Sequence, residues 1–192
     1  MNKSIVFACP LLLLAAVATA QIDPDPDGIG IYADLGATVT QVSAPAEVPF
    51  EVYLMLTRPS APNSIVAWSV GIVVPENAVI WGWNIAGDHW ANLGNPPYFV
   101  VACGMGGLPI QDVVRLMTFI VYLTDEDPAE FYITRSSEGY DWPLYLDYED
   151  IETFIQLHPW PRGSSQPAFC ANPGPTTPVL AATMGVVKNL YR

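Results

Sequence analysis

Residues 50–57 read Phe-Glu-Val-Tyr-Leu-Met-Leu-Thr, and this stretch decides the fold class. Every second residue from Phe50 to Leu56 is apolar, whereas Glu51, Tyr53, Met55 and Thr57 fall between them. Successive side chains of a β-strand point to opposite faces of a sheet, so a period of two indicates a strand with one buried face. The stretch therefore predicts a β-strand that lines a core.

The same alternation recurs between turn-forming residues along the chain. It is clearest in Ser64–Val74, where Trp68, Val70 and Ile72 share one face before a Pro-Glu-Asn turn. Further strands are predicted at residues 31–34, 37–42, 78–83, 98–103, 114–123, 129–134 and 142–147. Residues 151–158 fit a short helix as well as a strand. The pattern predicts an all-β protein, an antiparallel β-sandwich of immunoglobulin-like or jelly-roll type with roughly eight to ten strands.

Length and charge exclude several classes of protein. The chain has 192 residues, 51% of them hydrophobic, which is enough for one domain with a sizeable core. It carries 19 acidic against 7 basic side chains, a formal net charge of −12. That sign opposes binding to a phosphate backbone, so no nucleic-acid partner is expected.

The N-terminus has the pattern of an export signal. Lys3 precedes an apolar run from Ile5 to Val17, and Ala18-Thr-Ala20 follows as a cleavage site. We expect residues 1–20 to be a signal peptide cleaved after Ala20, and the mature protein to be secreted, extracellular or periplasmic. No later stretch is long and apolar enough to span a membrane, so no membrane span is expected in the mature chain.

The rest of the chain divides into four segments. We predict an acidic extended lead-in at 21–28, the β-sandwich at 29–158, a Pro/Gly-rich loop at 159–178 and a C-terminal strand or tail at 179–192. After signal cleavage two cysteines remain, Cys103 and Cys170. In an oxidising compartment such a pair predicts a disulfide, with two buried free thiols as the alternative.

One run of aspartates imitates a calcium-binding loop. Asp23, Asp25 and Asp27 alternate with prolines before Gly28, and Asp34 follows at the position of a twelfth-residue carboxylate. Hard oxygen ligands at this spacing bind Ca²⁺, and apart from this ion no cofactor is expected. The alternative is a solvated acidic segment, because the prolines stiffen the loop.

Aromatic residues suggest a sugar-binding surface. Tyr140, Trp142 and Tyr145 lie among the ten acidic residues of the span 125–152, and exposed rings beside carboxylates suit stacking and hydrogen bonding to a glycan. Trp81 and Trp83 share one strand face by the period of two, and form either a flat platform or part of the core. For Tyr140, Trp142 and Tyr145, too, the alternative is that the rings fill the core.

Three segments together resemble the strand order of cohesin-like domains, which are secreted bacterial β-sandwiches that hold partner modules or sit in cell-surface assemblies. They are residues 64–80, 114–123 and 129–134. The resemblance covers about half of the mature chain. It implies an immunoglobulin-like or jelly-roll sandwich with a binding role and no catalytic residues. The Trp-Gly-Trp sequence at 81–83 and the acidic span 125–152 depart from it.

The sequence is compatible with three functions. The first is a secreted, non-catalytic module that binds a protein partner or serves as an extracellular structural unit. The second is a carbohydrate-binding module for an extracellular glycan, stabilised by Ca²⁺. The third is a small secreted hydrolase, which requires two carboxylates at catalytic spacing. No nucleophile motif, phosphate-binding loop or histidine metal motif occurs in the sequence, so no catalytic residue is assigned and the protein is not expected to be an enzyme.

Overall fold

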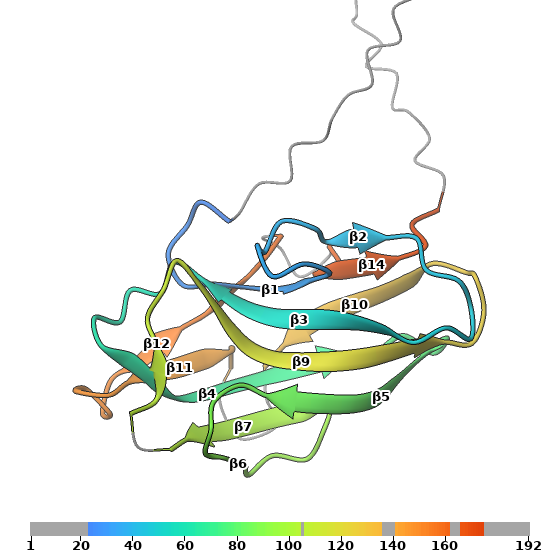
Figure 1. The fold of residues 1–192 in the computed structure, drawn as a ribbon. Helices are drawn as coiled ribbons and strands as arrows, with labels where there is room; N and C mark the ends of the chain where they lie inside the picture. Colours follow the sequence, from blue (N-terminus) through green and yellow to red (C-terminus); the bar gives the residue numbers. More distant parts are fainter. Residues whose placement is uncertain (1–22, 105, 136–140, 162–165, 175–192) are drawn as a thin grey trace, which may run out of the picture.

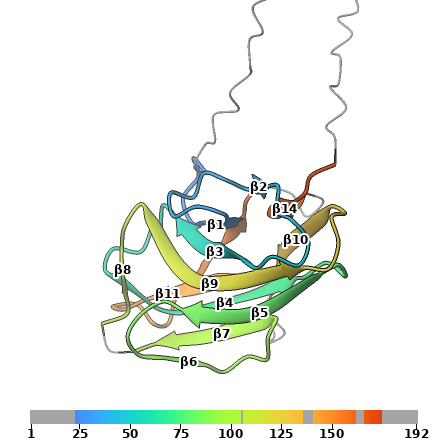
Figure 2. The ribbon, with the colours of Figure 1, turned by 45° about the vertical axis from the view of Figure 1, so that its right-hand side comes forward.

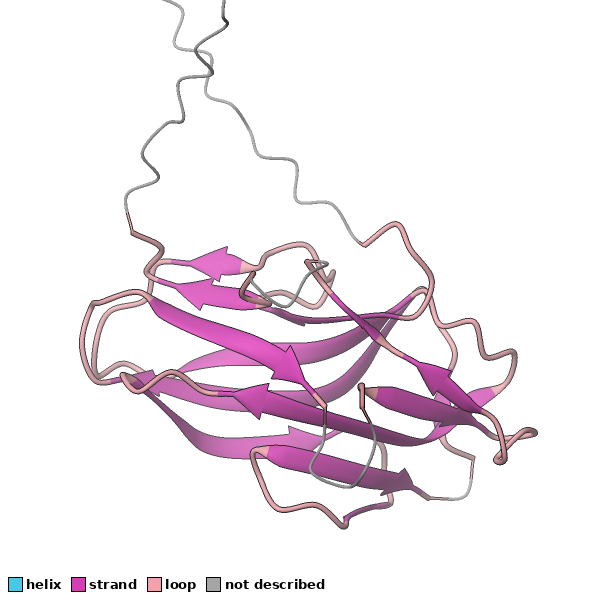
Figure 3. Cartoon of the chain, turned by 180° about the vertical axis from the view of Figure 1, so that it is seen from behind, coloured by secondary structure: helices cyan, strands magenta, loops and turns pink. Residues whose placement is uncertain are grey.

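The computed structural model describes residues 23–104, 106–135, 141–161 and 166–174. These residues form strands and loops without a helix, arranged as two sheets packed face to face (Figures 1 and 3). The described part of the chain therefore contains no helix able to span a membrane. The prediction of an all-β sandwich is confirmed.

The first sheet has five strands in the order β13-β1-β3-β9-β5. Their bounds are His158–Pro159 (β13), Gly28–Tyr32 (β1), Phe50–Thr57 (β3), Val113–Leu123 (β9) and Ala78–Ile85 (β5). All pairs in this sheet are antiparallel except β1 with β13. The two longest strand pairings of this sheet are those of β9 with β3 and with β5, so β9 lies between these two strands (Figure 2).

The second sheet is built around β4. Its strands are β4 (Ser64–Val73), β7 (Tyr98–Cys103), β6 (Trp90–Asn92), β8 (Leu108–Pro109), β10 (Ala129–Thr134), β11 (Leu144–Asp147), β12 (Phe154–Gln156), β14 (Phe169–Ala171) and β2 (Gln41–Val42). β7 and β8 pair with one edge of β4, while β11 and β10 follow one another along its other edge. A continuous surface therefore runs across β12, β11, β4, β7 and β6.

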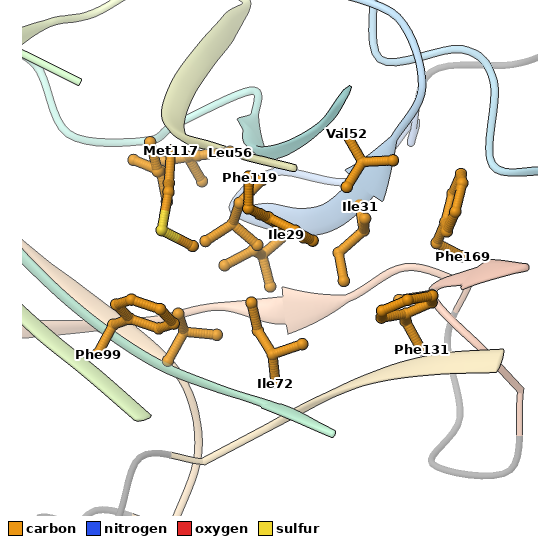
Figure 4. Packing of buried hydrophobic residues seen from close by; sticks show 14 of the residues in the cluster. Ile29, Ile31, Val52, Leu56, Ile72, Phe99, Met117, Phe119, Phe131 and Phe169 are labelled. Carbon is orange, nitrogen blue, oxygen red and sulfur yellow. The ribbon is translucent and has the colours of Figure 1, made fainter. Parts of the chain in front are cut away.

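The core lies between the two sheets and consists of the alternating apolar residues that the sequence presents. Ile29, Val52 and Phe119 from the first sheet face Ile72 and Phe131 from the second (Figure 4), and all five are at most 1% exposed. Close packing of such side chains removes apolar surface from water, which is the main stabilising term of the fold. The period of two in β3, β4 and β9 thus places the core as predicted.

Several sequence expectations need correction. For the span 151–158, which fitted a helix as well as a strand, the structure has the strand β12. The predicted loop 159–178 holds β14, whose Phe169 is 1% exposed in the core, because a three-residue apolar strand between proline-rich flanks gives no periodic signal. The sheets number fourteen strands among the described residues and are mixed, since β1–β13 and β14–β2 are parallel pairs.

Two predicted segments lie outside the described residues. They are the signal peptide at 1–20 and the C-terminal strand or tail at 179–192. The lead-in at 21–28 differs from an exposed segment, because Asp23 and Asp27 are buried against the sandwich.

Candidate binding faces

The outer side of the β4 sheet, which we call the β4 face, carries a row of apolar side chains. Trp68 and Tyr145 pair across β4 and β11 and both point into the core, so the residues on either side of them point outward. One row of directly paired residues crosses five strands: Phe154, Leu146, Ala67, Ala102 and Ala91. Four spacings between neighbouring strands make this row about 20 Å long.

The β4 face has no charged side chain among the described outward residues of its five strands. A second row parallel to the first consists of Gln156, Leu144, Ser69 and Val100, of which Leu144 and Ser69 are each 3% exposed and offer no open surface. Charge is instead found at the rim, where Glu149, Asp150 and Glu152 are exposed in the turn from β11 to β12. On a chain with net charge −12, the β4 face is thus an uncharged surface bordered by carboxylates.

The outer side of the first sheet, which we call the β9 face, differs because of a β-bulge in β5. Ile80 pairs with Val121 and Gly82 pairs with Ile120, which leaves Trp81 as an extra residue. Trp81 is 69% exposed and lies edge-on to Tyr122 on the outer side, with ring centroids 6.0 Å apart. The bulge exposes both rings, but it overturns the prediction that Trp81 and Trp83 share a face.

Trp83 lies at the open edge of the sandwich. It pairs with the inward-facing Phe119, and its ring meets Phe99 of the other sheet edge-on at 6.1 Å. It is 45% exposed because β5 is the last strand of its sheet. Trp83 therefore closes one edge of the core and forms no platform with Trp81.

Tyr145 is a core residue, which corrects its assignment to a sugar-binding surface. It is 0% exposed, and its hydroxyl donates to Oδ1 of Asp27 at 2.5 Å. The same hydroxyl accepts hydrogen bonds from the amides of Ser60 at 3.0 Å and Ala61 at 3.1 Å. Burial and the bond to Asp27 raise the pKa of Tyr145 to about 12. Of its predicted companions, Trp142 is 46% exposed and Tyr140 lies outside the described residues.

The predicted calcium loop does not form. Asp27 bonds Tyr145 and the amide of Ser60, the latter at 2.7 Å, whereas Asp34 turns into its own loop. The carboxylate of Asp34 accepts bonds from the amides of Gly36, Thr38 and Val39 and from the Thr38 hydroxyl. Within the described ranges, which include Asp23 and Asp25, no cluster of three or more acidic, His or Cys side chains is placed to hold a metal ion. Asp34 instead fixes its own loop, and Asp27 joins the start of β1 to the β3–β4 loop and to β11.

The predicted disulfide is also absent, since Cys103 and Cys170 are free thiols. Cys103 ends β7 beside the first half of β4, whereas Cys170 pairs with Glu130 beyond the other end of β4. This separation is on the order of 20–30 Å at the rise of a strand, and a disulfide needs Cα atoms within about 7 Å. Burial raises the pKa of the Cys103 thiol to about 11.

Asp147 is a buried carboxylate with a structural role at the edge of the β4 face. It is 3% exposed and accepts bonds from the Asn63 amide, the Asn63 side chain and the Ser64 amide at 3.1–3.3 Å. Burial alone raises its pKa, but these hydrogen bonds outweigh burial and leave the pKa below its ordinary value. The charged form is thus favoured in the folded state.

This lowered pKa predicts an acid-dependent stability. A carboxyl whose folded pKa is depressed stabilises the fold above the unfolded pKa, and that contribution is lost as the pH falls through the folded pKa. We expect Asp147→Asn to cost about 1–3 kcal/mol at pH 7 and to flatten the loss of stability below pH ~4. Urea unfolding at a series of pH values measures both effects. Asp112→Asn, which changes an exposed carboxylate, is the control. If the two variants had the same free energy of unfolding at every pH, the role of Asp147 would be contradicted.

The residues that form the β4 face were missed by sequence reasoning. A single alanine in a strand does not indicate a binding surface. Ala67, Ala91 and Ala102 become neighbours only when β4, β6 and β7 pair. The available hint was the alternation in Ser64–Val73, which places small residues opposite the large buried ones.

Comparison with known proteins supports the fold. No protein-family profile matches the sequence, and no curated protein matches it. Among solved structures, the sixth cohesin of scaffoldin B from Acetivibrio cellulolyticus, in complex with a dockerin, is similar at a TM-score of 0.51 and 11% identity, over 78% of this chain and 100% of that chain.

Two further cohesins are similar at lower TM-scores. A non-cellulosomal cohesin from the archaeon Archaeoglobus fulgidus aligns at 0.48 and 8% identity, over 77% of this chain and 88% of that chain. A type I cohesin from Clostridium thermocellum aligns at 0.48 and 10% identity, over 77% of this chain and 96% of that chain. Identities this low concern the fold alone. The chain is a β-sandwich with a cohesin-like fold.

Proposed function

We propose that this protein is an exported, non-catalytic binding module that holds a protein partner against its β4 face. The observation that carries the proposal is the uncharged row from Phe154 to Ala91 on a strongly acidic chain. Phe154, Ala102 and Ala91 are exposed in this row, and Leu146 and Ala67 are half-buried. Contiguous apolar surface that is open to water is typical of interaction sites. The proposed setting outside the cytoplasm rests on the signal-peptide pattern of residues 1–20.

The shape of the β4 face suits a protein better than a small ligand. Ala67, Ala102 and Ala91 project little from the sheet, so their end of the row offers a flat surface about 10 Å long rather than a cleft. Stable protein interfaces bury about 800 Å² on each partner, and their centres are depleted in charge. A cohesin with a similar fold was solved with a dockerin bound, which supports a protein as the partner.

The rim adds an expectation about the partner's charge. Glu149, Asp150 and Glu152 border the face beside Phe154 and favour a partner with basic side chains around an apolar centre. We therefore expect the association rate to fall with added salt, because exposed charges are screened beyond roughly 10 Å at 0.1 M ionic strength.

The test is a paired capture experiment. Wild type, Ala102→Arg and Val79→Arg are immobilised and exposed to the extracellular fraction of the native host. Ala102 is exposed on the β4 face and Val79 is 50% exposed on the β9 face, so each arginine is tolerated by the fold. We expect Ala102→Arg to weaken capture at least tenfold, because a cation would be desolvated in an apolar interface, and Val79→Arg to bind as wild type. A partner held equally by Ala102→Arg, or none held by wild type, would contradict the proposal.

A further inference from the structure

The β9 face contains a hollow that the proposed partner site does not use. Its volume is about 350 Å³, within the range of about 300–1,000 Å³ that small-ligand sites occupy. Gly82, Thr118 and Ile120 line it from the two strands β5 and β9, and Leu35 from the β1–β2 loop lines it as well. The strands β5 and β9 that line the hollow belong to the other sheet from β4 (Figure 1).

The bulge in β5 and its glycine create the space. Gly82 pairs with Ile120, and a Cβ added to Gly82 would meet nothing within 4 Å. The preceding Trp81 stands 69% exposed against Tyr122. An open depression and an exposed indole ring are therefore adjacent along one strand.

The loop that carries Leu35 is held in place by Asp34. Four hydrogen bonds from Gly36, Thr38 and Val39 to the Asp34 carboxylate fix the turn. Burial raises the pKa of Asp34, but these bonds outweigh it and leave the pKa below its ordinary value. The wall of the hollow is thus preorganised, which lowers the entropy lost when a ligand binds.

Side chains that donate hydrogen bonds and side chains that accept them surround the hollow. Glu51, Asn84 and Arg115 all line it. Arg115 takes part in no ion pair among the described residues, and Glu51 accepts a bond from the Tyr53 hydroxyl at 3.0 Å. A carboxylate, an amide and a guanidinium supply paired acceptors and donors of the sort that bind neighbouring hydroxyl groups. Glu51 lines the same hollow as Arg115, and its negative charge disfavours a phosphate or another anion.

We infer that the β9 face binds a neutral pyranose oligosaccharide, with one sugar ring against Trp81 and the next in the hollow over Gly82. A pyranose combines an apolar C–H face with a rim of hydroxyl groups, which matches an aromatic ring beside Glu51, Asn84 and Arg115. This site is independent of the proposed protein partner, because it lies on the other sheet.

The test is calorimetric titration with β-1,4-linked tetrasaccharides of glucose, xylose and mannose. We expect at least one to bind with a Kd between about 10 μM and 1 mM. Trp81→Ala removes the ring, and Gly82→Leu fills the hollow without meeting another atom at Cβ. Each should weaken binding at least tenfold. Trp90→Ala, which removes a 43% exposed tryptophan from the other sheet, should bind as wild type.

Two results would overturn the inference. One is no heat of binding for any of the three sugars at millimolar concentration. The other is binding that survives both Trp81→Ala and Gly82→Leu. Ala102→Arg should leave sugar binding unchanged, so failure of this site and failure of the protein-partner site are distinguishable.

Discussion

Replacing Trp68 by alanine is expected to lower the free energy of unfolding by about 3–5 kcal/mol, the range for removing a large aromatic side chain from a core. Trp68 is 1% exposed at the centre of β4, and its ring lies 6.3 Å from that of Phe99. The surrounding sheets cannot collapse into the space, because both are fixed by strand pairing. Urea unfolding followed by circular dichroism measures the change.

Trp81→Ala is the matched control, because it removes the same side chain from a position that is 69% exposed. We expect its effect to stay within about 0.5 kcal/mol. Similar losses for the two variants would contradict the inward direction of Trp68, and with it the outward direction of Ala67 on the β4 face.

Replacing Tyr145 by phenylalanine is expected to cost about 2–3 kcal/mol, although it removes a single oxygen. The hydroxyl satisfies the buried Asp27 carboxylate and the amide of Ala61 at once. Asp27 has a φ of 58° at the entry to β1, and its amide donates to the carbonyl of Arg58. Loss of the hydroxyl therefore removes the hydrogen bonds by which β11 holds the start of β1 and the β3–β4 loop.

Tyr148→Phe provides the comparison, since Tyr148 is 57% exposed only three residues later. We expect its free energy of unfolding to match wild type within about 0.5 kcal/mol. Equal stability of Tyr145→Phe and wild type in urea unfolding would show that the Asp27 bond contributes nothing.

The sequence predicted the sandwich and its core because burial imposes a period of two that survives in β3, β4 and β9. It could not predict the directions of Trp81 and Trp83, because a bulge inserts one residue and reverses the alternation after it. Tyr145 was misassigned for a related reason. Its neighbours Leu144 and Leu146 are as apolar as a core residue, so periodicity alone left the direction of β11 open.

The candidate sites could not be predicted, because they are formed by contacts between residues far apart in the sequence. The aspartates at 23–34 have calcium-loop spacing, but Asp27 finds its donors in Ser60 and Tyr145, which no local motif reveals. The β4 face arises from segments more than 80 residues apart in the chain, such as Ala67 and Phe154. Each is a feature of tertiary structure with no local signature.

The most direct test of the central claim is NMR mapping of the isotope-labelled domain with the partner recovered in the capture experiment. The account predicts amide shift changes in β4, β7 and β11 around Ala67, Ala102 and Leu146, with β3 and β9 unaffected. Changes confined to β3, β5 and β9 would place the partner on the β9 face and contradict the account.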